Sequence, residues 1–409
     1  MPSANMHSDL PLKLNVLIVG AGITGLTTAI ACVEKGFDVT ALEYTAQFSH
    51  VGAGLMISSN ASRILVDMGL RKPLDACGIH MRRTVFKKWD DGAVLSETTY
   101  LDAEEKLGAP LWQVHRADLH DALLAKAKSV GVNIRMGARV KKFNPEEPSV
   151  LLDDGEVVRA DIVVASDGYR SRARSEMLGC QDDPRPSGNS AYRALIPGAV
   201  MKSDPEMAEF MDMENQTTFS WVGDGAHILG YPIRQGEFYN VVSTQTARKA
   251  TGAQYVVPVD SSEFMERFQS WDPKLVGILK KLPKDGVLEW KLCDLEPMKS
   301  WLFPGAKIVL IGDASHAMLP SSAQGAGMGI EDGAAIAELL ARAESKSQIP
   351  AVLKTFQNLR LPRTTFVADS GRRNAKKWHE KDAKGGTVTD DMWNYDVKNE
   401  AREIPIEGI

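Results

Sequence analysis

"NVLIVGAGITGLTTAI", residues 15–30, is an apolar run that meets three glycines and then continues with helical spacing. Val16 to Val19 are continuously apolar, as in a parallel strand that is buried on both faces. After the glycines, apolar residues recur every three or four positions until Gly36, and "DVTALE" (38–43) has the pattern of the next strand. The stretch therefore predicts a strand–helix–strand unit with a glycine turn after its first strand.

The glycines of this turn, Gly20, Gly22 and Gly25, have the spacing GxGxxG. In such a turn the first glycine permits a tight bend, the second lets the backbone approach a pyrophosphate, and the third lets the helix pack close to the strand. Free N–H groups at the helix start then face the phosphates. Glu43, which ends the second strand, would bind a ribose diol and repel a 2′-phosphate. We therefore expect the turn to hold FAD or NAD, not NADP.

Composition narrows the class of ligand. The chain has 409 residues, which favours two domains, and its net charge of -5 offers no broad basic field for nucleic acid or an anionic membrane. The four cysteines are far apart and form no CxxC, so neither a metal site nor a disulfide framework is expected. The first residues lack the apolar core of a signal peptide, and no run is long enough to span a membrane. These features predict a cytoplasmic protein with a small-molecule ligand.

Distant segments are expected to build one domain. From about residue 187, short β-rich runs alternate with Gly/Asp turns, which is typical of an antiparallel sheet, and the buried-strand pattern returns at "AKIVLIGDASHAM" (306–318). We interpret the chain as an α/β protein with three parts. These are a discontinuous Rossmann-like domain (1–75, 106–183 and 301–345), an antiparallel substrate domain (76–105 and 184–300) and C-terminal helices (346–409).

A second glycine-rich turn favours FAD over NAD. Gly312 and Asp313 end the later strand, and "AQGAGMGIEDG" (323–333) leads into another helix. The ribityl chain of a flavin needs a carboxylate partner, which Asp313 would supply. The reduced ring gathers negative charge, which backbone N–H groups at a helix start would stabilise, here those of Gly325, Ala326 and Gly327. A solvated aspartate before a plain loop is the alternative.

The motifs "GAGITG", "SDGYRSRAR", "YRALIP", "YPIR" and "GDASHAMLP", the last followed by "QGAGMGIEDG", occur here in one order. In them the chain resembles the FAD-dependent aromatic hydroxylases, the single-component flavoprotein monooxygenases, and most of all their salicylate hydroxylase-like branch. The likeness extends over roughly residues 14–400 and includes "FQNLRLPRTTFV" (356–367). It implies a p-hydroxybenzoate hydroxylase-like fold, bound FAD, and NAD(P)H as cosubstrate without a separate domain for it.

The resemblance also implies roles for single residues. Asp167 falls in the family's Asp-Gly motif, which is associated with both FAD and the pyridine nucleotide, and Arg116 matches an arginine near the flavin. Ala53 and Gly54 fall where backbone lines the flavin ring. Ser59 departs from the pattern, because many relatives carry proline there, and this puts the rigidity of that loop in doubt.

Three side chains are candidates for substrate chemistry. Arg193, in "AYRALIP", contacts substrate or peroxide in similar enzymes, and a guanidinium can stabilise a phenolate or carboxylate; a surface ion pair is the alternative. Tyr231, in "GYPIR", could orient an oxygenated ring or could simply be a buried aromatic residue. His50 could act as a base, although a lone histidine in a loop is more often solvated.

The implied reaction is hydroxylation of an aromatic or heteroaromatic small molecule with NAD(P)H and O2. A phenol, a salicylate-like acid or an indole-like compound would react with a flavin hydroperoxide, which the protein must shield from water. The alternatives are a flavin dehydrogenase or reductase on the same scaffold and, less favoured, a ligand-binding protein without activity. The sequence leaves open the substrate, the choice between NADH and NADPH, and whether the protein is a monomer or a homodimer.

Overall fold

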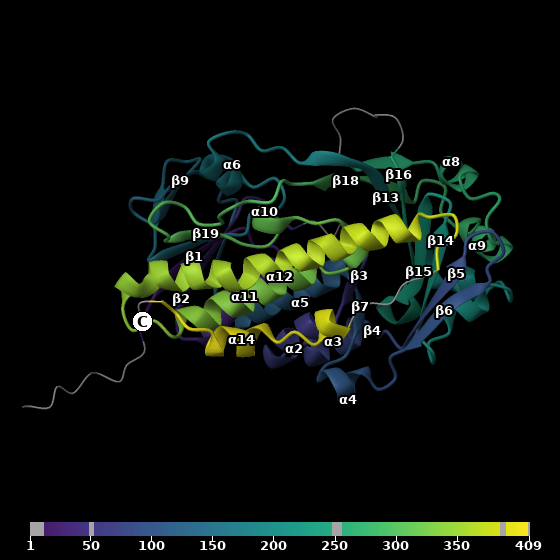
Figure 1. The fold of residues 1–409 in the computed structure, drawn as a ribbon, viewed down its shortest axis with the longest axis horizontal. Helices are drawn as coiled ribbons and strands as arrows, with labels where there is room; N and C mark the ends of the chain where they lie inside the picture. The colour runs from purple at the N-terminus through teal and green to yellow at the C-terminus, as the bar shows by residue number, and fades with distance from the viewer. Residues whose placement is uncertain (1–11, 49–52, 248–255, 385–389, 408–409) are drawn as a thin grey trace, which may run out of the picture.

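The computed structural model describes most of the chain, namely residues 12–48, 53–247, 256–384 and 390–407. His50, considered above as a base, lies outside these residues. Figure 1 shows two sheets toward opposite ends of the long axis, with the long helix α12 (Ile349–Trp378) running from one to the other.

The first sheet is parallel and is built from segments far apart in the sequence. Its inner strands are buried on both faces, as their continuous apolar runs predict. All four pairings are parallel, which confirms the predicted discontinuous Rossmann-like domain of an α/β protein. In sheet order the strands are β19 (Ile308–Leu310), β12 (Ile162–Ala165), β1 (Asn15–Val19), β2 (Asp38–Glu43) and β8 (Asn133–Met136).

Two helices that begin at the glycine-rich turns pack against each other, α1 (Ile23–Glu34) and α11 (Gly325–Leu340). A Cβ on Gly333 of α11 would lie 2.8 Å from the backbone nitrogen of Thr28 in α1. Small residues on α11 therefore let the two helices approach closely, and this places both glycine turns at the same edge of the parallel sheet.

The second sheet has eight strands and is the predicted antiparallel sheet, with one difference in detail. The pairing of β14 with β5 is parallel, so the sheet is mixed. The reason is topological, because β5 and β6 come from an earlier segment and join the sheet at its edge. In sheet order the strands are β17 (Val256–Val259), β18 (Val287–Asp294), β13 (Arg185–Pro197), β16 (Phe238–Thr246), β15 (Ala226–Ile233), β14 (Thr217–Gly223), β5 (Arg83–Lys88) and β6 (Val94–Thr99).

Short helices cover one face of this sheet over an aromatic core that includes Trp221 and Phe268. These helices are α7 (Gly198–Lys202), α8 (Ser261–Glu266) and α9 (Pro273–Leu279). The opposite face carries Arg193 and Tyr231 and faces the parallel domain. At its far edge α12 ends against this face, where Trp378 packs on Phe86 and His227 at ring distances of 5.8 and 5.1 Å.

Two small sheets and several short helices complete the fold. Asp154 and Gly155 form the predicted hairpin turn between β10 and β11, with Gly155 at φ 91. None of the described helices combines the length and the apolarity needed to cross a bilayer. The small sheets are β3 (Gly54–Ile57), β7 (Trp112–His115) and β4 (Ile79–His80), and β11 (Val157–Arg159), β10 (Ser149–Leu152) and β9 (Val140–Asn144). The remaining helices are α2 (Ser59–Asp67), α3 (Arg71–Cys77), α4 (Ala103–Leu107), α5 (Arg116–Ser129), α6 (Arg172–Leu178), α10 (Asp313–His316), α13 (Asp390–Trp393) and α14 (Val397–Glu403).

Candidate active site

The first glycine turn has the shape of a pyrophosphate cradle. Gly20 has φ 101, and a Cβ on it would collide with the carbonyl oxygen of Ser166. A Cβ on Gly25 would collide with the carbonyl of Gly20, so this glycine is required for close packing of helix on strand. A Cβ on Gly22 would meet nothing within 4 Å, and no side chain caps the start of α1 there. The first N–H groups of α1 therefore face open space, which fits a phosphate ligand.

Glu43 lies beside this turn and is nearly buried. Its carboxylate accepts hydrogen bonds from the N–H of Ala21 and from the N–H and hydroxyl of Thr45, each at 3.0 Å. A carboxylate has about four acceptor positions, so one more donor can be accommodated. Glu43 thus holds the turn together, and its binding of a ribose stays a prediction.

Asp167 follows β12 at the same edge of the sheet, but its carboxylate is used locally. It accepts hydrogen bonds from the Ser171 hydroxyl at 2.5 Å and from the N–H groups of Arg172 and Ala173 at 2.8 and 3.1 Å, where α6 begins. Burial raises the pKa of this carboxyl group. Asp167 therefore caps α6, and a direct contact with cofactor or cosubstrate stays a prediction.

Asp313, at the start of α10, has the properties of a ligand-binding carboxylate. Its side chain is accessible to solvent, yet burial among protein atoms raises its pKa, against the charges of His316 and Arg116. In the described part of the chain no protein group donates a hydrogen bond to this carboxylate, so its oxygens are available to donors of a ligand. A polyol chain could supply the missing donors, as the ribityl assignment predicts.

The start of α11 lies near Asp313, because Gly312 and Gly329 both lie against Thr24 of α1. Gln324 precedes the helix without a side-chain cap, and the backbone of Gly325 and Ala326 is partly exposed, whereas Gly327 is buried beside Asn60. The N–H groups of this first turn are thus available to a negatively charged ligand group.

Ala53 and Gly54 lie between the parallel domain and the eight-stranded sheet. The carbonyl of Ala53 accepts a hydrogen bond from the N–H of Arg116 at 3.1 Å. Gly54 donates its N–H to the side-chain oxygen of Asn240 at 3.0 Å. The loop after them departs from the family pattern at Ser59, whose hydroxyl donates to the carbonyl of Trp393 at 2.8 Å. This bond ties the start of α2 to the C-terminal segment.

Arg116 lies within electrostatic range of two other predicted site residues, Asp313 and Arg193. It begins α5 with its side chain exposed. Its charge lowers the pKa of Asp313 and also that of Arg193. Residues predicted separately from three segments of the sequence are thus brought together.

Arg193 and Tyr231 lie on the same face of the eight-stranded sheet. Burial lowers the pKa of the Arg193 guanidinium, which is paired with no acidic side chain among the described residues. This argues against the alternative of a surface ion pair. Burial raises the pKa of Tyr231 to about 12, although the nearby charge of Arg193 opposes that shift. Tyr231 is therefore a neutral phenol next to an uncompensated cation.

Sequence reasoning missed three residues at this site. Asn240 holds Gly54, and nothing local in "EFYNVVST" marks it, because the pairing spans 186 residues. Glu331 and Asp332 are fully buried in α11. The signal for them is the pair of adjacent acidic residues in "GMGIEDGAAIA" (327–337), which is otherwise apolar.

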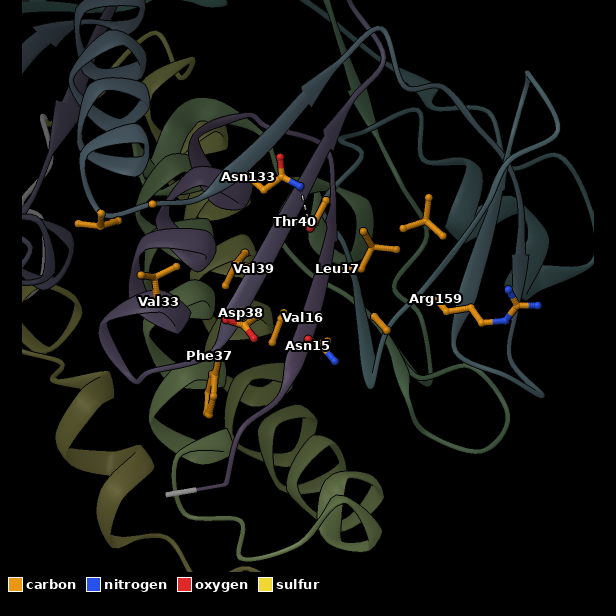
Figure 2. A pocket seen from close by; sticks show the side chains of 14 residues that line it. Asn15, Val16, Leu17, Val33, Phe37, Asp38, Val39, Thr40, Asn133 and Arg159 are labelled. Atoms are coloured by element: carbon orange, nitrogen blue, oxygen red, sulfur yellow. Dashed lines mark hydrogen bonds between the residues drawn. The ribbon is translucent and has the colours of Figure 1, made fainter. Parts of the chain in front are cut away.

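A hollow elsewhere on the parallel domain is not this site. Figure 2 shows it beside Asn15, Asp38 and Asn133, which begin β1, β2 and β8. Ligands of parallel α/β sheets bind at the carboxyl ends of the strands, where Gly20, Glu43 and Asp167 lie. The hollow is at the opposite ends, and none of the predicted side chains lines it.

Comparison with known proteins agrees with this geometry. A family model described as "FAD binding domain" matches residues 13–263 and 298–370. The FAD-dependent monooxygenase OpS4 of Beauveria bassiana (strain ARSEF 2860) is 34% identical over 376 residues, which cover 90% of this chain and 86% of the relative. The 3-hydroxybenzoate 6-hydroxylase 1 of Aquipseudomonas alcaligenes is 31% identical over 365 residues, 88% of this chain and 88% of the relative.

A solved structure confirms the fold. A salicylate hydroxylase substrate complex matches with a TM-score of 0.79 and 24% identity over 95% of this chain and 97% of that chain. The glycine cradle and the partner-free Asp313 fit FAD, and the family match covers both of them. This chain belongs to the FAD-dependent monooxygenases, the single-component flavoprotein aromatic hydroxylases that use FAD with NAD(P)H.

Proposed function

We propose that this monooxygenase hydroxylates a small aromatic compound that carries an ionisable oxygen, either a phenol or a salicylate-like acid. The observation that carries the proposal is the guanidinium of Arg193, which has no acidic partner in the part of the chain that the structure describes. A buried cation without a partner is costly, and an anionic ligand oxygen would relieve that cost through charge-assisted hydrogen bonds. The names of two similar proteins, a 3-hydroxybenzoate hydroxylase and a salicylate hydroxylase, support the same chemical class.

The residues around Arg193 suit an aromatic ring. Leu229 and Val242 are partly exposed partners on neighbouring strands, and Val242 is also opposite Arg193. Tyr231, which stays protonated at neutral pH because its pKa is raised to about 12, can donate a hydrogen bond to a ring oxygen. We assign Arg193 to hold the ring oxygen in its anionic form, Tyr231 to orient the ring, and the two apolar side chains to exclude water.

The cofactor residues divide into two groups. Gly20, Gly22, Gly25 and Glu43 would bind the ADP half of FAD. Asp313 would bind the ribityl hydroxyls, while the backbone of Ala53 and Gly54 and the helix start at Gly325, Ala326 and Gly327 would border the ring. Arg116 and Asp167 would lie near the ring and the cosubstrate. When bound, FAD accepts a hydride from NAD(P)H and, once reduced, activates oxygen for transfer to the substrate.

We also propose which segments of the chain bind each ligand. Residues 1–75, 106–183 and 301–345 would bind FAD, and residues 76–105 and 184–300 would bind the substrate. The oligomeric state, monomer or homodimer, does not enter this assignment, because every residue used lies on one chain.

A compound screen tests the proposal. Salicylate-like acids, phenols and neutral indoles are each added to the holoenzyme, and their stimulation of NADH and NADPH oxidation is measured together with product mass. We expect a phenol or an aromatic acid to stimulate oxidation and to gain one oxygen atom. Stimulation confined to neutral indoles would contradict the role of Arg193, and oxidation of substrate without oxygen gain would favour the dehydrogenase alternative.

A further inference from the structure

A buried pair of acidic residues lies behind the cofactor residues, and the proposed function does not use it. Glu331 and Asp332 of α11 are 0% exposed, and so is Arg360, which α12 places between them. Arg360 forms an ion pair with Glu331 through Nη1 at 2.6 Å and donates a hydrogen bond to Asp332 through Nε at 2.8 Å. Arg363 of the same helix also bonds Glu331, through Nη2 at 3.1 Å, so two guanidinium groups from the C-terminal helix face the two carboxylates in the core of the FAD domain.

The second oxygen of Asp332 is bonded to the turn that carries Asp313. It accepts the N–H of Gly312 at 2.9 Å and a hydrogen bond from Nε2 of His316 at 2.6 Å. These donors flank Asp313 on both sides, because Gly312 precedes it and His316 ends the short helix α10. Gly312 has φ 61, a backbone conformation that glycine adopts readily and other residues rarely do. By accepting the Gly312 N–H, Asp332 holds the backbone directly before Asp313.

Glu331 supports the start of α11 in the same way. Its Oε1 accepts a hydrogen bond from the side-chain nitrogen of Asn60 at 2.6 Å, and Asn60 also donates to Gln324 at 3.0 Å. Gln324 is buried and immediately precedes the start of α11. It donates in turn to the hydroxyl of Ser58 at 2.6 Å. The residues before α2 and before α11 are therefore fixed relative to each other.

We propose that Asp332, with Arg360 as its counter-ion, is the positioning residue for the redox half of FAD, setting the direction of Asp313 while contacting no cofactor atom itself. The inference rests on the proposed assignment of Asp313 to the ribityl chain. Because Arg360 is part of α12, binding of the redox half of FAD would depend on the packing of this helix, which lies outside the Rossmann-like segments.

A merely structural role predicts a different result. A buried ion pair that only stabilises the fold would, when broken, weaken every ligand of the FAD domain together. Loss of a residue that only positions Asp313 would weaken binding of the redox half of FAD and leave binding of the ADP half unchanged. ADP distinguishes the two, because it occupies the cradle of Gly20 and Glu43 and has no ribityl chain to reach Asp313.

The test compares the dissociation constants of FAD and ADP, measured by calorimetry on apoprotein of the full chain. Asp332→Asn keeps the shape of the side chain but weakens the acceptor of two hydrogen bonds. We expect FAD binding to weaken by about tenfold or more, as for the loss of one charge-assisted bond, while ADP binding changes by less than about twofold. Equal weakening of both ligands, or unchanged FAD binding, would overturn the proposal.

A matched control lies two turns further along the same helix. Glu338 is 5% exposed and bonds Lys35 and Arg402, away from the cofactor turns. Glu338→Gln also breaks a partly buried ion pair, and we expect it to leave the ratio of FAD to ADP affinity unchanged.

A second variant covers the case in which Asp332→Asn does not fold. His316→Leu removes one donor to Asp332 and leaves the pairing with Arg360 intact. It should show the same selective loss of FAD affinity to a smaller extent, and an unchanged ratio would contradict the proposal. The result is independent of the compound screen, since neither ligand requires an aromatic substrate.

Discussion

A Cβ placed on Gly54 would lie 2.6 Å from the hydroxyl oxygen of Tyr231 and 3.0 Å from the side-chain carbon of Asn240. The backbone assigned to the flavin ring is therefore in direct contact with the face of the sheet assigned to the substrate. A shift of one part of the site therefore moves the other.

This contact predicts the effect of Gly54→Ala. The added methyl group must displace Tyr231, and overpacking of this kind costs about 1–3 kcal/mol of unfolding free energy. We expect FAD to be retained, while a larger fraction of NAD(P)H oxidation produces hydrogen peroxide in place of hydroxylated product. The double variant Gly54→Ala with Tyr231→Phe removes the closest atom, so it should recover part of the lost stability; a double variant no more stable than Gly54→Ala would refute the contact.

Arg193→Ala should separate cofactor binding from substrate chemistry. The guanidinium is assigned to the substrate oxygen alone, so FAD content should be unchanged while coupled hydroxylation falls by about 10²-fold or more. The Arg193→Lys variant keeps the positive charge but loses the two parallel N–H donors of the guanidinium. Its coupled hydroxylation should therefore lie between that of the wild type and that of Arg193→Ala. The measurement is product formed per NAD(P)H oxidised, and unchanged product formation in Arg193→Ala would remove this residue from the site.

Asp313 should make FAD binding sensitive to acid. Burial raises its pKa, so on acidification this carboxyl group is protonated at a higher pH than an ordinary aspartate. The neutral acid is a weaker acceptor for ribityl hydroxyls, and FAD affinity should therefore fall as pH decreases toward that raised pKa. Asp313→Asn should bind FAD more weakly at neutral pH and should lose this pH dependence. A variant with full flavin content and activity would show that the ribityl assignment is wrong.

Glu43→Ala provides the complementary result. Glu43 bonds the N–H of Ala21 in the first glycine turn and is assigned to the ribose of the ADP half. Its loss should weaken ADP and FAD by similar factors of about tenfold, as expected for a hydrogen bond to a charged group. Calorimetry with both ligands checks this, and selective weakening of FAD alone would place Glu43 at the wrong half of the cofactor.

The end of α12 should give the protein a pH-dependent stability. His227 is buried and bonds His379 at 3.0 Å, and burial together with the charge of His379 lowers the pKa of His227 from 6.5 to about 3. The unfolded chain binds a proton at this group near pH 6.5, whereas the folded chain does so only near pH 3. Its contribution to stability is therefore complete above pH 6.5 and is lost progressively as pH decreases toward 3. Thermal unfolding of His227→Leu should depend less on pH over this window, and an unaltered dependence would contradict the burial of a neutral imidazole.

The sequence predicted those parts of the site that rest on local physical requirements. The positive φ of Gly20 and the close contact of Gly25 with Gly20 are local constraints, so the spacing of Gly20, Gly22 and Gly25 was sufficient to predict the turn. Asp313 followed from its place between a buried strand and a glycine-rich helix start. The resemblance to a known family supplied Arg193 and Arg116, which no local pattern marks.

Long-range register explains what the sequence did not predict. Asn240 acquires its role only by lying opposite Tyr231 and beneath Gly54. Asp332 acts on Gly312 across a helix contact, and Asp167 is engaged by α6 in a way that its motif does not reveal. The parallel pairing of β5 with β14 was missed for the same reason, because strand order depends on partners far away in the chain.

We propose that the face bearing Arg193 presents an ionised aromatic ring to FAD for oxygen transfer. The most direct measurement is mass spectrometry of the product formed under 18O2 by wild-type enzyme and by Arg193→Ala. We expect the wild-type enzyme to place one 18O atom in the ring of a phenol or aromatic acid. The Arg193→Ala variant should place almost none there, although it contains as much FAD as the wild type. NAD(P)H oxidation that yields only hydrogen peroxide with every phenol and aromatic acid, or equal 18O incorporation by the variant, would contradict it.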